Sequence, residues 1–330
     1  MKRIARFLAK MVFAVIAAIM VLWSMAAIYY SNIPWHFLRV GGAIAFLVLV
    51  AAVFFAVRPF RRAMAIFFAV FGVILLWWLL IPASNHRDWQ PDVASLTAYT
   101  IDGNMITVRN IRNCDYRTET DYTVAYYDKT FDLTKLRGAD LFICFWGPTL
   151  IAHTMMSFDF DDNQYLCISI ETRKEKGEDY SAVRGFFKQY ELIHIVGDER
   201  DLVRLRTDFR KEKLYLYRLN TDPNIVRSVL LDYLKTINDL NAKAQWYNAL
   251  TENCTTAIRG HASPYTHGKM SWKILANGYL DTLLYERKVI DTNMPFERIK
   301  QMSLINDRAL QAGNSPDFSR IIRAGLPNPY

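Results

Sequence analysis

Hydrophobic residues dominate the first quarter of the chain and alternate with polar ones afterwards. Three long apolar runs come first, at Phe7–Tyr30, Phe37–Val57 and Ala63–Ile81. Each approaches or exceeds the ~20 residues that a helix needs to cross the hydrocarbon core of a bilayer. The pattern predicts a membrane anchor of three transmembrane helices over residues 1–83. The first run is long and lacks a clear small-residue cleavage pattern, so a retained span is favoured over a signal peptide.

The charges in this region predict its orientation. Eight basic and no acidic residues lie in the first 83 positions, mostly before the first run or in the Arg58–Arg62 turn. The positive-inside rule places both stretches in the cytoplasm and residues 84–330 outside it, as in a multi-pass membrane protein. Of the 40 Lys and Arg residues, 32 remain to balance the 32 Asp and Glu residues. The net charge of +8 therefore reflects topology and gives no support to nucleic-acid binding.

Residues 84–330 are long enough for one well-packed domain. Asp102-Gly103-Asn104 predicts the turn of a hairpin over Thr97–Asn110. The helical period predicts an amphipathic helix at Asn224–Ala242, and the last 60 or so residues also favour helices. Strands followed by helices, without βαβ alternation, predict an α+β domain with an antiparallel sheet. Further strands are expected at Tyr122–Tyr127, Ala139–Trp146, His153–Phe160, Tyr165–Glu171, Glu191–Val196 and Leu214–Leu219, and a short helix or turn at Thr130–Arg137.

Cys254 is the candidate nucleophile. Thr251 or Asn253 can cap a helix, which places Cys254 in its first turn. Unpaired N–H groups and the helix dipole there lower the pKa of a thiol and increase the thiolate fraction. The alternative is a buried structural cysteine. Cys144 and Cys167, in strand-like runs, are expected to be core residues, and no Cys/His spacing indicates structural zinc.

The base and its orienting group are expected on two paired strands. If the loop between them is centred on Asp162, the residue numbers of antiparallel partners sum to about 324, and His153 faces Glu171. Alternation then puts both on the more polar sheet face, where the carboxylate would orient the imidazole. The alternative is that this polar face is the solvated one. The expected polar face carries His153, Met155, Ser157, Asp159, Cys167, Ser169 and Glu171, and the apolar face Thr154, Met156, Phe158, Leu166, Ile168 and Ile170.

Other polar groups fit simpler roles. His194 lies in a strand and is expected to be structural, and His261 is two helical turns beyond Cys254. Asp159–Asp162 is better explained by a hairpin turn than by a metal loop. Arg173–Asp179 is expected to be a solvated loop that could also meet a lipid head group, and Glu199-Arg200-Asp201 a surface or ion-pair cluster. No metal or cofactor is expected.

With these residues identified, the domain resembles the Lnb N-terminal periplasmic domain family, named for a bacterial lipoprotein N-acyltransferase. The resemblance covers most of Trp89–Ile258, and neither the apolar leader nor the tail after about residue 265. The matching segments are Trp89–Ala94, Arg109–Arg112, Tyr126–Asp128, Trp146-Gly147, Ala152–Thr154 with Ser157-Phe158, Ile170–Arg173 with Gly177-Glu178, Glu199–Asp201, and Tyr247-Asn248 through Asn253–Thr256.

The resemblance implies a circularly permuted papain-like fold of the NlpC type, in which the histidine precedes the cysteine. It implies Cys254 as nucleophile, His153 as base and Glu171 as third member. It also implies transfer of an acyl chain from a phospholipid through a thioester to an amine, such as a lipoprotein N-terminus. A cysteine peptidase or amidase acting on cell-wall peptides, using the same triad, and a non-catalytic envelope scaffold are the alternatives.

Overall fold

The computed structural model describes residues 2–147, 149–248, 254–265, 269 and 271–327. The chain divides into two compact units. The first combines Met1–Ala83 with Ser181–Tyr190, and the second combines Ser84–Tyr180 with Glu191–Tyr330. Each unit is described by itself below.

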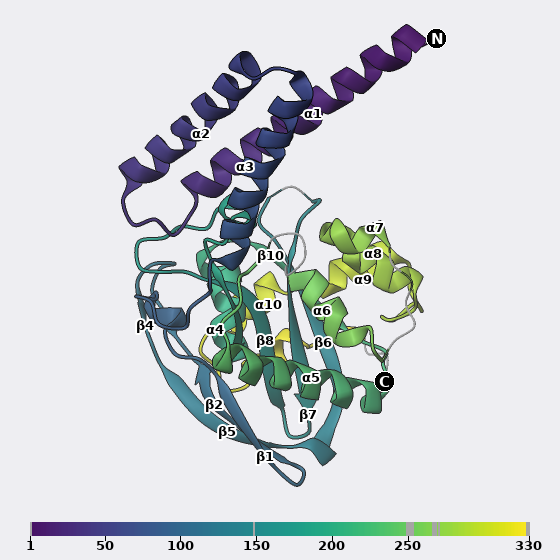
Figure 1. The fold of residues 1–330 in the computed structure, drawn as a ribbon. Coiled ribbons are helices and arrows are strands. Elements are labelled where there is room, and N and C mark those ends of the chain that lie inside the picture. The colour runs from purple at the N-terminus through teal and green to yellow at the C-terminus, as the bar shows by residue number, and fades with distance from the viewer. Residues whose placement is uncertain (1, 148, 249–253, 266–268, 270, 328–330) are drawn as a thin grey trace. The chain divides into compact units, whose positions relative to one another are not determined.

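The first unit contains three long apolar helices, α1 (Lys2–Tyr29), α2 (His36–Ala56) and α3 (Phe60–Leu80) (Figure 1). The helix predictions are confirmed to within a few residues at most ends. All three helices are long and apolar enough to cross a membrane. At 1.5 Å per residue, the 21 residues of α2 or α3 span about 31 Å, close to the thickness of a hydrocarbon core. Most of their large apolar side chains are exposed, as expected for helices solvated by lipid.

The second unit is built on an eight-stranded sheet with the order β1-β2-β9-β8-β7-β6-β10 and with β5 paired to β2. The pairs are antiparallel apart from a single parallel pair between β2 and β9, at Arg112 and Gly197. The predicted α+β class is confirmed. The strands are β1 (Ala98–Asp102), β2 (Met105–Arg112), β5 (Tyr126–Asp132), β6 (Leu136–Phe145), β7 (His153–Phe160), β8 (Gln164–Arg173), β9 (Glu191–Gly197) and β10 (Lys213–Arg218), and a separate ribbon pairs β3 (Asp115–Tyr116) with β4 (Tyr122–Thr123).

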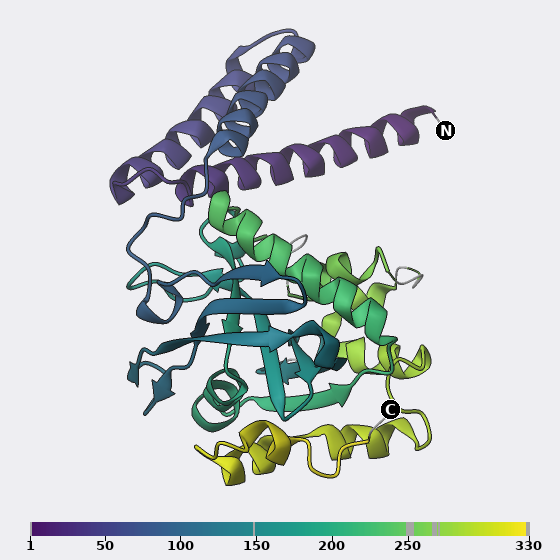
Figure 2. The ribbon, with the colours of Figure 1, turned by 90° about the horizontal axis from the view of Figure 1, so that it is seen from below.

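Helices cover both faces of this sheet (Figure 2). On one face α5 buries its apolar stripe, from Val226 to Leu240, in the core cluster of the sheet, and it lies closest to β1, β6 and β9. On the other face, side chains of α4, α10 and α11 pack on alternate residues of β6, β7, β8 and β9. The described helices of this unit are α4 (Glu199–Arg204), α5 (Pro223–Ala242), α6 (Cys254–Ala262), α7 (Trp272–Leu275), α8 (Leu280–Glu286), α9 (Phe296–Ser303), α10 (Asn306–Ala312) and α11 (Phe318–Ile322). It also contains the short helical turns η1 (Pro91–Val93), η2 (Leu133–Lys135), η4 (Leu205–Phe209) and η5 (Asn277–Tyr279). A further turn, η3 (Arg184–Phe186), belongs to the first unit.

Two predicted elements differ from the structure. The expected strand Tyr122–Tyr127 is split, because β4 pairs with β3 whereas β5 leaves that ribbon to pair with β2. The expected helix or turn at Thr130–Arg137 is mostly strand, with only the short turn η2 between β5 and β6. Pairing with strands that are distant in sequence determines the conformation of both segments, and local sequence patterns do not predict this pairing.

The polar face of β7 and β8 is buried, so the alternative that it faces solvent is wrong. Ser157 and Ser169 are fully buried, and Asp159 is nearly so. Ser157 donates to Glu199 at 2.5 Å, and Glu199 is bound in turn by Arg323, which follows α11. The C-terminal helices therefore cover this face, and the buried polar side chains of the strands find charged partners there.

This packing decides two expectations about charged residues. The ion pairs considered for Glu199 and Asp201 are confirmed, but they lie in the interior, where both residues are under 4% exposed, and not at the surface. Asp201 accepts two hydrogen bonds from Arg112, at 2.8 and 3.0 Å, which fasten α4 to β2. Arg173 is the last residue of β8, and is also buried. Its guanidinium donates to the carbonyls of Val93 and Ala94 at 3.0 and 2.8 Å.

The buried network contains three carboxylates, Asp140, Asp159 and Glu199, around Arg218 and Arg323. Burial, reinforced by the charge of Asp140, raises the pKa of Asp159 to about 6. Because this value lies above the ordinary one, the folded state binds more protons between about pH 4 and 6. The contribution of Asp159 to stability therefore falls as the pH rises through that range.

We predict that Asp159→Asn removes this pH dependence while keeping an acceptor for Arg218. The Tm of the variant relative to wild type should rise by a few degrees between pH 4 and pH 7, which corresponds to roughly 1–3 kcal/mol. The measurement is thermal unfolding of the full chain in detergent at both pH values. Asp162→Asn, in the exposed hairpin turn, is the matched control and should show no such rise. Parallel curves for Asp159→Asn and wild type would contradict the prediction.

Candidate active site

His153 and Glu171 lie side by side on neighbouring strands. The pairing of β7 with β8 runs from Met155 opposite Ser169 to Phe160 opposite Gln164. The predicted register, in which partner numbers sum to 324, is confirmed. His153 Nε2 lies 3.2 Å from Glu171 Oε1 and 2.8 Å from Ser169 Oγ.

The hydroxyl of Ser169 indicates which nitrogen of His153 carries a proton. Ser169 donates its single hydroxyl proton to Glu171 Oε1 at 2.6 Å, so its oxygen accepts from His153. The proton therefore resides on Nε2. With Nε2 engaged by Ser169 and Glu171, Nδ1 is the ring nitrogen that would exchange a proton with a substrate or a thiol.

Arg206 binds the same carboxylate oxygen of Glu171 as His153 and Ser169. This buried guanidinium, on η4, donates to Glu171 Oε1 at 2.6 Å and to the carbonyl of Leu202 at 2.9 Å. Burial by itself would raise the pKa of Glu171. The charges of His153 and Arg206 and the hydrogen bonds from His153 and Ser169 outweigh it and hold that pKa well below the ordinary value. Glu171 is therefore an ionised hydrogen-bond acceptor at neutral pH.

Ser169 and Arg206 were not selected as site residues from the sequence. Ser169 lies on the expected polar face between His153 and Glu171, so side-chain alternation was a usable signal for it. Arg206 reaches Glu171 only because α4 and η4 fold onto the sheet. Nothing in the local sequence around Arg206 indicates that contact.

Three of the four cysteines are unsuitable as nucleophiles. Cys114, Cys144 and Cys167 are free thiols that are buried, as expected for the last two. Cys144 lies opposite His153 in the β6–β7 pair, but burial raises its pKa, as it raises the pKa of Cys167. Burial, helped by the charge of Asp201, raises the pKa of Cys114 to about 11. A thiol held protonated in this way is a poor nucleophile.

Cys254 is the first residue of α6, so its predicted position in the first helical turn is confirmed. Its side chain lies outside the described residues, as do Thr251 and Asn253, the candidate caps. Tyr247 is partly buried against the core on the α5 face.

The start of β7 and the start of α6 are joined by direct contacts. Thr154 and Thr255, which directly follow His153 and Cys254, have their hydroxyl oxygens 3.3 Å apart. Asn277, on η5, bridges the same two segments. Its Oδ1 accepts from the N–H of Ala152 at 2.7 Å, and its Nδ2 donates to the Ala152 carbonyl at 2.6 Å and to Thr255 Oγ1 at 2.8 Å. This buried amide thus fixes the residue before His153 and the residue after Cys254.

Asn277 can reach these partners because the next residue is a glycine. The N–H of Gly278 donates to the Leu150 carbonyl at 3.1 Å. A Cβ at Gly278 would lie 1.7 Å from the Thr149 carbonyl oxygen, so another residue there would force the two segments apart. Asn277 and Gly278 lie in the tail beyond about residue 265, where sequence reasoning identified no role.

Two other histidines are structural. His194 is buried in β9, as expected, and desolvation, with a contribution from His261, lowers its pKa to about 3. His261, at the end of α6, donates from Nδ1 to the Oδ2 of Asp232 on α5 at 2.7 Å. That contact faces α5 and ties α6 to it.

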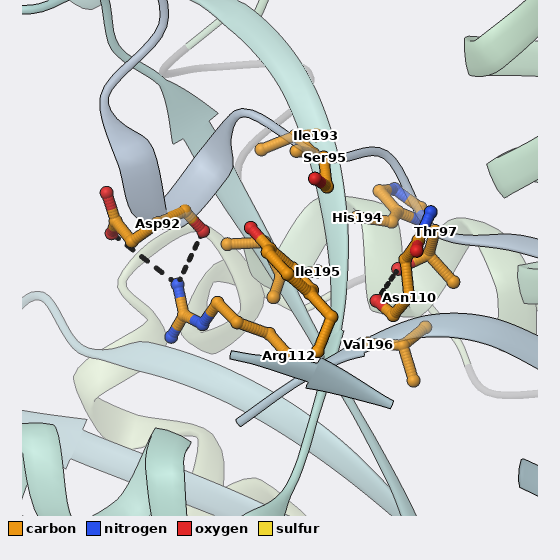
Figure 3. A pocket seen from close by; sticks show the side chains of 10 residues that line it. Asp92, Ser95, Thr97, Asn110, Arg112, Ile193, His194, Ile195 and Val196 are labelled. Carbon is orange, nitrogen blue, oxygen red and sulfur yellow. Dashed lines mark hydrogen bonds and ion pairs between the residues drawn. The ribbon is translucent and has the colours of Figure 1, made fainter. Parts of the chain in front are cut away.

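Two cavities of the second unit do not include His153 or Glu171. One lies beside Arg112, Asn110 and His194 (Figure 3), and its volume of about 10 Å³ is enough for a water molecule only. The other, of about 330 Å³, is lined by polar residues around Tyr165 and Asp198. Among the described residues, no group of three His, Cys, Asp or Glu side chains is arranged to hold a metal ion.

Comparison with known proteins identifies the family. The model of the Lnb N-terminal periplasmic domain matches residues 122–283. Residues 122–283 therefore form a domain of that family, and the resemblance seen in the sequence is confirmed. The match begins later and ends later than the sequence segments suggested, and it includes Asn277. Neither the comparison with curated proteins nor that with solved structures gave a match. A periplasmic-domain family joined to three candidate spans describes a membrane protein of the cell envelope.

We predict that Asn277→Ala loosens the junction between β7 and α6. The N–H and carbonyl of Ala152 would each lose the hydrogen bond to Asn277, at about 1 kcal/mol for each bond. Tm should fall by several degrees, and the Ala152 amide should exchange its hydrogen faster. Both are measurable on the full chain in detergent. Asn293→Ala, in an exposed turn, is the matched control. An unchanged exchange rate at Ala152 would show that Asn277 does not hold this junction.

Proposed function

We propose that the protein is a periplasmic cysteine acyltransferase anchored in the inner membrane. In this proposal Cys254 is the nucleophile, His153 the general base and acid, and Glu171 the group that orients His153. The observation that carries the proposal is the hydrogen-bonded series from His153 through Ser169 and Glu171 to Arg206. This series begins at a strand end that Asn277 and Thr154 fasten to the start of the Cys254 helix.

The first half-reaction loads the enzyme. His153 Nδ1 takes the proton of the Cys254 thiol, and the thiolate attacks the ester carbonyl of a phospholipid. A carbon–sulfur bond forms, and the carbonyl π electrons move to oxygen. The ester bond then breaks, and the imidazolium protonates the departing lysophospholipid alkoxide, leaving a thioester. The N–H of Cys254, with Asn253 or Tyr247, would stabilise the oxyanion.

The second half-reaction transfers the chain to an amine, such as a lipoprotein N-terminus. The amine attacks the thioester, His153 accepts a proton from it, and the thiolate leaves and recovers a proton. Glu171 stabilises the imidazolium formed in each half-reaction, since its carboxylate stays ionised. If water replaces the amine, the same residues would carry out hydrolysis.

The proposal also includes the membrane topology and the arrangement of the fold. The basic residues near α1 and between α2 and α3 support a cytoplasmic N-terminus and a periplasmic second unit. The order of the elements, with the histidine strand β7 before the cysteine helix α6, supports a circularly permuted papain-like arrangement. A membrane anchor gives such an enzyme continuous access to lipid substrates.

The central prediction is a covalent acyl adduct on Cys254. Full-length protein incubated with phospholipid vesicles should gain the mass of one acyl chain, and neutral hydroxylamine should remove it as expected for a thioester. Cys254→Ala should abolish the adduct. Cys114→Ala, at a buried thiol with a raised pKa, should keep it. An adduct of equal yield on Cys254→Ala would refute the assignment. Release of the chain to water rather than to an added amine would favour the hydrolase alternative.

A second prediction concerns the orienting carboxylate. Glu171→Gln keeps the shape of the side chain but removes the charge that stabilises the imidazolium, so the acylation rate should fall by about 10²–10⁴-fold. The measurement is single-turnover formation of the adduct. Glu178→Gln, in the loop after β8, is a matched control, since it neutralises a glutamate outside the series. A rate for Glu171→Gln within threefold of wild type would exclude this role for Glu171.

A further inference from the structure

The segment Ser181–Tyr190 lies between β8 and β9 in sequence but groups with the three apolar helices rather than with the sheet. The chain therefore passes between the two units three times, after Ala83, after Tyr180 and after Tyr190. Polar and aromatic contacts bind this inserted segment to the helices of the first unit.

Lys188 binds the C-terminal end of α3. Its ammonium donates to the carbonyls of Trp78 and Leu79 at 2.9 Å and of Ile81 at 3.3 Å. It also lies 4.7 Å from the centre of the Trp78 ring. The last carbonyls of a helix have no partner within the helix and carry its negative dipole end, so a cation is favoured there. Lys188 thus acts as a cap for α3.

The neighbouring residues bind the end of α1. Gln189 donates to the carbonyl of Tyr30, and the Phe187 ring stacks on the Tyr30 ring with centroids 5.5 Å apart. Phe187 also contacts Trp23. The segment therefore binds the C-terminal ends of both α1 and α3.

The helix α3 is about as long as a hydrocarbon core is thick, so when it crosses a bilayer its last residues reach the boundary between acyl chains and head groups. Tyr29, Tyr30, Trp77 and Trp78 gather there, as aromatic residues do at membrane interfaces. Fastened at this level, the segment still exposes Val183 and Phe186, which are 53% and 37% exposed. Exposure of such side chains to water is unfavourable.

We propose that Ser181–Phe187 is an additional membrane-contacting segment, which inserts Val183 and Phe186 into the interfacial layer of the bilayer. Its partner is the lipid leaflet in which α1 and α3 end. Lys188 and Gln189 hold the segment at this depth by binding the helix ends. The strands that flank it, β8 and β9, are thereby tethered to the membrane surface in addition to the link after α3. This inference holds whether or not Cys254 is catalytic.

Site-specific fluorescence tests the proposal. Val183→Cys is placed in a Cys254→Ala background, where the other thiols are buried, and labelled with an environment-sensitive fluorophore. The full chain is reconstituted in vesicles of phosphatidylethanolamine and phosphatidylglycerol, with or without lipids that carry a nitroxide near the head group. We expect a blue-shifted emission and at least twice the lipid quenching seen with the same label at Ile101→Cys, an exposed apolar position at the β1–β2 turn.

Two outcomes would overturn the proposal. The first is lipid quenching at position 183 no greater than at position 101, with efficient quenching by aqueous iodide, which would leave this face to a soluble partner. The second is full lipid quenching at position 183 in the Lys188→Met variant, which would overturn the proposed anchoring of the segment by Lys188. The acyl-adduct assay on the unlabelled protein is independent of both results, so failure of this proposal is distinguishable from failure of the proposed chemistry.

Discussion

Side chains of β7 and β8 alternate between two helical layers, and this alternation fixes both the core and the candidate site. Met156, Phe158, Leu166 and Ile168 pack beneath α5, while the residues between them face α4, α10 and α11. A slip of one residue would exchange the two sets and place Ser157 and Asp159 beneath the apolar stripe of α5. The register that builds the core is therefore the one that sets Glu171 opposite His153.

The buried ion pairs on the face of the sheet opposite α5 determine how the helices dock. Arg323 reaches Glu199 and Asp140 from the end of the chain, and Arg112 reaches Asp201 from β2. Buried pairs of this kind add little net stability compared with apolar packing, but a mismatched partner is costly. We infer that they select one arrangement of α4, α10 and α11 on the sheet. Arg206 reaches Glu171 from the turn that continues α4, so this selection also determines where the guanidinium meets the carboxylate.

The sequence predicts those features that depend on local periodicity. The three apolar helices, the β7–β8 register and the position of Cys254 at a helix start follow from runs, turns and caps within some twenty residues. Burial of charge could not be predicted in the same way. Glu199, Asp201 and Arg173 look like surface residues in sequence, and only Arg323, Arg112 and the Val93 and Ala94 carbonyls, distant in the chain, explain their burial. The role of Asn277 could not be predicted for the same reason, since its hydrogen-bond partners lie more than 20 residues away.

The low pKa of Glu171 limits the chemistry that the site can support. If the pKa of Glu171 were raised above that of the imidazolium, the carboxylate could take the proton of His153 and leave a neutral pair. Arg206 and Ser169 prevent this by stabilising the carboxylate. In the proposed reaction, a proton taken from the thiol therefore remains on the imidazole. The resulting charge favours the neighbouring thiolate and stays available for the leaving group, which is what acyl transfer through sulfur requires.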